Sequence, residues 1–169
     1  ASGALVYYFD NGGRLEYQGG ASRSNGVGVT SAGRNQLKDW GYWNQQVRFT
    51  SNSWFAQAYA TRSLSGKTFA LNGYTTNRAS ARFNGISDDS VKKASAFPAD
   101  GRMMAAEVQH NRTFTSLFNT RVIGGVQYRK DQVSSKQVWL TDALTKEDIE
   151  LTQLGVYAQT ETPLNAITK

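Results

Sequence analysis

Histidine and cysteine, two residue types that often carry catalysis, are scarce in this chain. His110 is the only histidine. It falls in the middle of a predicted strand, where it alternates with Val108. Nucleophilic catalysis by serine or threonine needs an adjacent base, and the sequence offers no evident partner for His110. We therefore interpret His110 as a packing or interface residue, and we predict that the chain is not an enzyme.

Motifs for metal or phosphate binding are incomplete. Asp10-Asn11-Gly12 is similar to the start of a calcium loop, but the later ligands and the closing glutamate are missing. The adjacent acids Asp88-Asp89 point apart and are typical of a solvated helix cap. Gly26-Val27-Gly28 lacks the helix that must follow a phosphate-binding loop. The chain has no cysteine, which excludes disulfides and thiolate metal sites. We expect no cofactor.

The composition favours a β-protein. Apolar residues make up 39% of the 169 residues, aromatic residues 12%, and there are 16 glycines but only two prolines. These proportions suit many strands joined by tight turns. The net charge of +6 comes from scattered lysines and arginines; no basic stripe is present, so we expect no nucleic-acid partner. The longest apolar run, residues 4–9, is far too short for a membrane helix.

Alternation of polar and apolar residues predicts seven strands, at about 4–9, 14–22, 43–50, 54–62, 102–114, 119–132 and 149–161. An eighth would begin near the last residue. The connections alternate in length: they are short at 10–13, 51–53 and 115–118, long at 25–42 and 63–101, and intermediate at 133–148. A short helix is predicted near 89–96, with Ser87 or Asp88 as its N-cap.

Alternating loop lengths are typical of outer-membrane barrels, whose periplasmic turns are short and whose extracellular loops are long. We therefore predict an all-β fold, an antiparallel up-and-down meander that forms part of a transmembrane β-barrel. Residues 1–169 make a single segment of seven to eight strands, with long extracellular loops at 25–42 and 63–101. The expected location is the bacterial outer membrane, with membrane lipid as a partner.

The two faces of the predicted strands differ in polarity. The mild face is expected to meet lipid and to include Leu15, Tyr17, Val47, Phe49, Val122, Val126, Val156 and Ala158. The polar face is expected to meet a wet lumen and to include Arg14, Glu16, Arg48, Arg121, Gln127, Arg129, Gln159 and Glu161. Aromatic residues gather at membrane–water interfaces, so we expect Trp43, Trp54 and Phe55 to lie there.

Two stretches resemble a known family. Residues 13–66, from "GRLEYQGGASRSNG" to "WFAQAYATRSLSG", resemble the early barrel strands of TonB-dependent outer-membrane receptors. "LGVYAQTETPL", residues 154–164, is similar to that family's recurrent Gly-x-Tyr-x-Gln-x-Glu strand. The resemblance implies a barrel of about 22 strands around an N-terminal plug. It also implies uptake of a scarce nutrient, such as a siderophore, cobalamin or a glycan, driven by the inner-membrane TonB complex.

The sequence departs from that family pattern, because we find neither a plug nor a TonB box and count only about seven strands. We therefore expect a fragment of such a receptor, whose partners are the remainder of the barrel and plug, or other chains that complete the sheet. The TonB complex would act through the missing N-terminal part. Two alternatives remain open: a free-standing eight-stranded outer-membrane barrel with a structural or adhesive role, and a soluble β-barrel that binds a small ligand.

Overall fold

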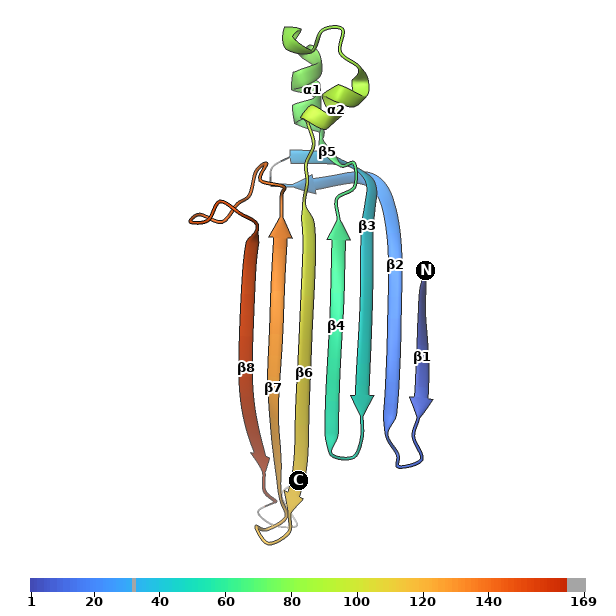
Figure 1. Cartoon of the computed structure of the whole chain (residues 1–169), viewed down its shortest axis with the longest axis vertical. Coiled ribbons are helices and arrows are strands. Elements are labelled where there is room, and N and C mark those ends of the chain that lie inside the picture. Colours follow the sequence, from blue (N-terminus) through green and yellow to red (C-terminus); the bar gives the residue numbers. More distant parts are fainter. Residues whose placement is uncertain (32, 164–169) are drawn as a thin grey trace.

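The chain forms one antiparallel sheet whose long strands follow chain order. A computed structural model describes residues 1–31 and 33–163. The strands lie side by side in the order β1-β2-β3-β4-β6-β7-β8, and β5 pairs with β3 (Figure 1). The elements are β1 Ser2–Tyr8, β2 Arg14–Thr30, β3 Gly33–Thr50, β4 Trp54–Leu64, β5 Phe69–Ala70, α1 Leu71–Ala79, η1 Ala81–Phe83, α2 Asp88–Ala94, β6 Asp100–Phe114, β7 Thr120–Ser134 and β8 Ile149–Glu161. The predicted all-β, up-and-down meander is confirmed.

The sheet is open at both sides. Within the described residues, β1 pairs only with β2, and β8 pairs only with β7. No register joins β1 to β8, so this part of the chain is a curved single-layer sheet and not a closed barrel. The predicted eighth strand beyond residue 165 lies outside the described residues.

Three short turns lie at one end of the sheet, here called the turn end, at residues 9–13, 51–53 and 115–119 (Figure 1). The first turn is held by Asn11, whose Oδ1 accepts the Gly13 amide at 3.1 Å, and by Gly12 at φ +81°. In the second, the Ser51 hydroxyl accepts the Trp54 amide at 3.1 Å. Asparagine, glycine and serine favour such turns because they tolerate positive φ or bond to nearby backbone. All three predicted short connections are therefore confirmed.

The expected long loop at 25–42 is wrong. β2 continues to Thr30 and β3 resumes at Gly33, so both strands run through this segment. The register shifts between Ser24 and Gly26, and Asp39 has φ +57°. Such irregularities bend a β-ribbon, and the outer part of this hairpin turns across the end of the sheet (Figure 1). Each of its sides mixes polar residues with a few apolar ones, which weakens the amphipathic period that marks a half-buried strand.

The other long connection holds a small folded unit. β4 ends at Leu64 and β6 begins at Asp100, so the connection spans residues 65–99, here called the cap segment. It contains β5, α1, η1 and α2, and it projects beyond the strand ends (Figure 1). Ser87 is the N-cap of α2, and its side chain accepts the Ser90 amide at 3.3 Å. The predicted helix and its N-cap are thus confirmed, with the helix starting one residue earlier than expected.

Candidate functional site

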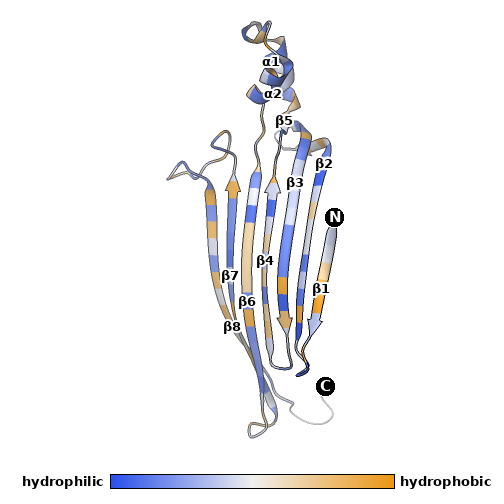
Figure 2. Ribbon diagram, turned by 45° about the vertical axis from the view of Figure 1, so that its right-hand side comes forward, coloured by the Kyte–Doolittle hydropathy of each residue, from blue (hydrophilic) through white to orange (hydrophobic). Residues whose placement is uncertain are grey.

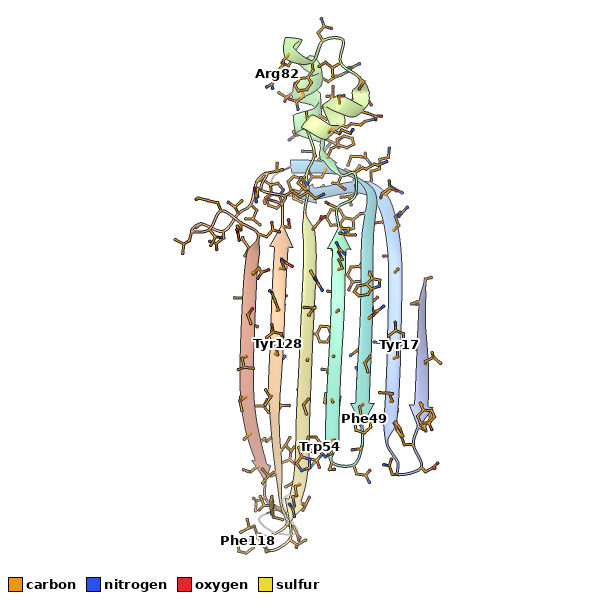
Figure 3. The ribbon with its side chains drawn as sticks, in the orientation of Figure 1. Tyr17, Phe49, Trp54, Arg82, Phe118 and Tyr128 are labelled. Atoms are coloured by element: carbon orange, nitrogen blue, oxygen red, sulfur yellow. The ribbon has the colours of Figure 1, made fainter. Side chains whose placement is uncertain are left out.

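Residues that pair across antiparallel strands lie on the same face of a sheet, so the registers define two faces. One face, here called the apolar face, holds all eight residues that were expected to meet lipid. Two neighbouring rows that cross the whole sheet on this face are entirely apolar: Tyr7, Leu15, Phe49, Ala56, Val108, Val126 and Val156, and then Leu5, Tyr17, Val47, Ala58, Ala106, Tyr128 and Leu154. Figure 3 shows Tyr17 and Tyr128 at mid-height, on strands near opposite sides of the sheet.

Nothing in the described chain covers the apolar face. Val156 is 77% exposed, Leu5 and Leu154 are each 73% exposed, and the described residues bury only Phe69, Val91 and Ala105 among their apolar side chains. The chain exposes 12036 Å² in all. A folded water-soluble monomer of 18.6 kDa exposes about 8,200 Å². The excess fits a single-layer sheet whose two faces are open in the described chain, with hydrophobic and hydrophilic residues interspersed along its strands (Figure 2).

The apolar face has defined margins along the strands. On β4, every side chain from Trp54 to Ala60 that points to this face is apolar, and Arg62 follows, paired with Arg102 on β6. Six residue steps of about 3.4 Å make the band roughly 20 Å long on β4, and it is shorter on β3 and β7, which carry Gln45 and Lys130 in the Ala60 row. The length on β4 is slightly less than the apolar band of about 25 Å in outer-membrane barrels. The long stems of Arg62 and Arg102 extend apolar surface beyond the band while their charges reach water.

Two of the three expected interface aromatics lie at these margins. Trp54 starts β4 at the turn end, and Trp43 pairs with Arg62 at the other margin. Both are on the apolar face. Phe55 follows Trp54 at the turn end but points to the opposite face, where it pairs with Thr50, and the interface role of all three aromatics stays a prediction. Neighbouring residues of a strand point to opposite faces, and one of two adjacent aromatics must therefore turn away.

The opposite face, here called the polar face, holds all eight residues that were expected to line a lumen: Arg14, Glu16, Arg48, Arg121, Gln127, Arg129, Gln159 and Glu161. Many of its charges are matched by a neighbour. Arg14 forms an ion pair with Glu16, Arg121 lies 3.8 Å from Glu161, and Arg129 bonds Asp131 at 2.7 Å. This face therefore suits contact with water or polar solutes.

A chain of hydrogen bonds crosses the polar face from β2 to β8, and the sequence patterns had not singled it out. Gln18 bonds Gln46, and Gln46 donates to Gln57 at 3.2 Å. Gln57 in turn donates to Glu107 at 2.9 Å. Tyr157 of β8 completes the chain by donating its hydroxyl to Glu107 at 2.9 Å. These five side chains are here called the polar ladder.

The last step of the polar ladder passes over β7 at a glycine. Tyr157 pairs with Gly125, and a Cβ at position 125 would fall on the tyrosine ring. Because this position has no side chain, the ring can lie across β7 and reach Glu107 on β6. An aromatic side chain that packs over a glycine of the neighbouring strand helps to fix the strand register. The signal in the sequence was Gly125 in one strand and Tyr157 in the next, which can be matched only once the register is known.

His110 contacts a backbone carbonyl and a neighbouring aromatic ring. Its Nδ1 lies 3.0 Å from the carbonyl oxygen of Ser53, and its ring centroid lies 4.3 Å from that of Trp54. It therefore joins the start of β4 to β6 beside the 51–53 turn. Within residues 1–31 and 33–163, no group of three or more His, Asp or Glu side chains is placed to hold a metal ion.

The clearest electrostatic cluster outside the sheet is in the cap segment. Asp88 accepts a hydrogen bond from Lys92 and another from the Tyr74 hydroxyl at 2.5 Å. These two bonds lower the pKa of Asp88 below its usual value. The same contact with Asp88 raises the pKa of Lys92 and that of Tyr74. The three side chains tie α1 to α2.

The class that this geometry defines is an open antiparallel meander sheet with one apolar and one polar face. Comparison with known proteins found no match among family models, curated proteins or solved structures. Among the described residues, no helix has the length and apolar character required to cross a membrane.

Proposed function

We propose that this chain is a sector of an outer-membrane β-barrel of the TonB-dependent receptor type, which takes up a scarce nutrient and carries out no catalysis. The observation that carries the proposal is the pair of wholly apolar rows, left uncovered on a single-layer sheet and backed by a polar face. In a membrane barrel, the apolar face meets lipid and the polar face meets the lumen. The resemblance of residues 13–66 and 154–164 to such receptors supports the choice of class.

The lack of a second layer favours lipid over water as the cover of the apolar face. A water-soluble domain packs the apolar face of a sheet against another layer. Here the small buried core belongs mainly to the cap segment, where Phe69 and Val91 are buried. Lipid would cover the two apolar rows without any further protein layer.

The open edges favour assembly into a larger sheet. β8 presents 13 residues and β1 presents seven, each with one side unpaired within the described chain. An unsatisfied backbone group in lipid costs several kcal/mol, and in water such edges pair with other chains. The proposal therefore requires partner strands beside β1 and β8, supplied by the rest of a receptor barrel or by other chains.

The positions of the connections suggest an orientation. The turn end would face the periplasm, and the cap segment and the 135–148 loop would face the outside of the cell. The polar ladder would line the lumen, which holds the plug domain and through which the nutrient passes. Energy from the TonB complex would reach this sector through the other parts of the receptor.

Labelling of intact cells tests the proposal. The chain has no cysteine, so Arg82→Cys in the cap segment and Ser116→Cys at the turn end each add a single thiol. We expect an impermeant maleimide to label position 82 in intact cells and position 116 only after the outer membrane is permeabilised. We also expect the membrane-extracted chain to migrate differently on gels before and after heating. Recovery of the chain as a soluble monomer, without detergent, would favour the soluble ligand-binding alternative instead.

A further inference from the structure

The cap segment contains a cavity of about 510 Å³ that the proposed barrel does not explain. Four lysines line it, Lys38, Lys67, Lys92 and Lys93, against a single acidic residue, Asp89. Small-molecule sites commonly have volumes of roughly 300–1,000 Å³. The cavity therefore has the size of a ligand site and a marked excess of positive charge.

The backbone holds these lysines together from three separate segments. Lys38 comes from the outer part of β3, and the amide of Lys67 donates to its carbonyl at 2.8 Å. Gly66 forms a parallel bridge with Lys38 and has φ +60°. A Cβ at position 66 would lie 2.6 Å from the Lys38 carbonyl oxygen, so only glycine permits this approach. The wall of the cavity is thus built by backbone contacts rather than by flexible side chains alone.

The far wall comes from α2 and the residues that follow it. The amide of Phe97 donates to the carbonyl of Thr68 at 3.0 Å, and the amide of Ala70 donates to that of Ser95 at 2.9 Å. These bonds place the last turn of α2, with Lys92 and Lys93, beside the segment that carries Lys67.

Most of the positive charge in this cavity has no partner in the described chain. Lys92 is bonded to Asp88. Among residues 1–31 and 33–163, no ion pair involves Lys38, Lys67 or Lys93. Gathering three such ammonium groups around one hollow is unfavourable unless an anion joins them, because like charges repel. A cleft lined by one sign of charge also concentrates ions of the opposite sign.

We propose that this lysine-lined cavity binds a small soluble polyanion, one that carries two or more phosphate or carboxylate groups. Each ammonium group offers three hydrogen-bond donors and no acceptor, which suits the oxygens of such groups. A free solute fits better than a lipid headgroup, because the cap segment projects past the strand ends, away from the apolar band (Figure 1). The inference deepens the proposed function, since it assigns a ligand class to the proposed extracellular end of the sheet.

Titration calorimetry of the full chain, in neutral detergent and at low ionic strength, provides the test. The probes are inorganic pyrophosphate and citrate. We expect at least one of them to bind, and the double variant K67Q/K93Q to raise its dissociation constant tenfold or more. The matched control is K136Q/K146Q, which removes the same charge from the neighbouring 135–148 loop and should change the constant less than twofold. Lys92 is left intact because its bond to Asp88 supports the fold of the cap.

Two results overturn the inference. One is that neither probe binds to the unaltered chain. The other is that both double variants weaken probe binding equally, which would show that binding depends only on the net charge of the chain. Binding to vesicles that contain anionic phospholipid, without binding of either soluble probe, would assign the lysines to a lipid headgroup instead. Failure here is distinguishable from failure of the proposed function, because heat-dependent gel migration of the same sample reports membrane folding. A chain that proves soluble in water can be titrated without detergent.

Discussion

The sharpest consequence of the face assignment concerns one charge placed on two adjacent residues of β7. Val126 lies in a wholly apolar row, between Val108 and Val156, and is 48% exposed. Gln127 follows it on the polar face, paired with Glu107. If lipid covers the apolar face, Val126→Arg places a guanidinium near the middle of the apolar band. Gln127→Arg adds the same charge to a face that meets water.

The expected cost follows from the depth of position 126. An arginine near the bilayer midplane of a barrel costs roughly 2–4 kcal/mol. Because each 1.4 kcal/mol is about a factor of ten, the ratio of folded to unfolded chain should fall about 30- to 700-fold. For Gln127→Arg, we expect a change within about 0.5 kcal/mol, as for ordinary surface substitutions. Equilibrium unfolding in urea, followed by tryptophan fluorescence in lipid vesicles, measures both values. Equal costs for the two variants would refute the face assignment.

Three further perturbations follow from single contacts. Gly125→Ala should lower the free energy of unfolding in the same assay by about 0.5–1.5 kcal/mol, because the added Cβ displaces the outer end of the Tyr157 ring and breaks its hydrogen bond to Glu107, whereas Gly124→Ala, which has room for a Cβ, should cost less than half as much. The hydrogen bonds from Lys92 and Tyr74 hold the pKa of Asp88 below its usual value in the folded cap. The ionised form of Asp88 therefore stabilises the cap above about pH 4, and protease cleavage of the cap should increase as the pH falls below that value, with Asp88→Asn removing most of the pH dependence. Trp139→Phe loses a 2.7 Å hydrogen bond to a carbonyl of the cap segment and should speed amide hydrogen exchange in the β7–β8 loop; unchanged exchange would show that this bond does not anchor the loop.

The strand faces were predictable from sequence because the polar and apolar environments alternate with the pleat. Leu15 and Tyr17 alternate with Arg14 and Glu16 in a pattern that only one register preserves, and β1 to β3 adopt that register. The tight turns were predictable for a local reason, since residues such as Asn11 and Gly12 satisfy the turn by themselves. Period and turn chemistry are short-range signals, and both are visible in one sequence.

Features that lack an amphipathic period were not predictable. The hairpin through 25–42 was mistaken for a loop because each of its sides mixes polar and apolar residues, while its backbone groups are paired as in any other ribbon. The alternation of Val27 and Val29 was the only trace of a strand there.

The sites that join distant segments were also beyond the sequence. Lys38 meets Lys67 and Lys93 only through the backbone bonds of Gly66 and Thr68 with their neighbours. In the sequence alone, nothing distinguishes any of these lysines from an ordinary surface residue. The polar ladder likewise depends on a tyrosine that reaches across a whole strand, a contact that pairwise alternation does not indicate.

The claim that lipid covers one face of this sheet and water the other is tested most directly by spin labels on β7 in reconstituted vesicles. The chain has no cysteine, so single thiols at 122, 126 and 128 on the apolar face, and at 121, 123 and 127 on the polar face, can be labelled one at a time. Oxygen concentrates in lipid, and a charged nickel chelate stays in water. We predict that oxygen relaxes the labels at the even positions and the chelate those at the odd positions, with a period of two residues. Equal access of the chelate to both sets would contradict the proposed membrane sector.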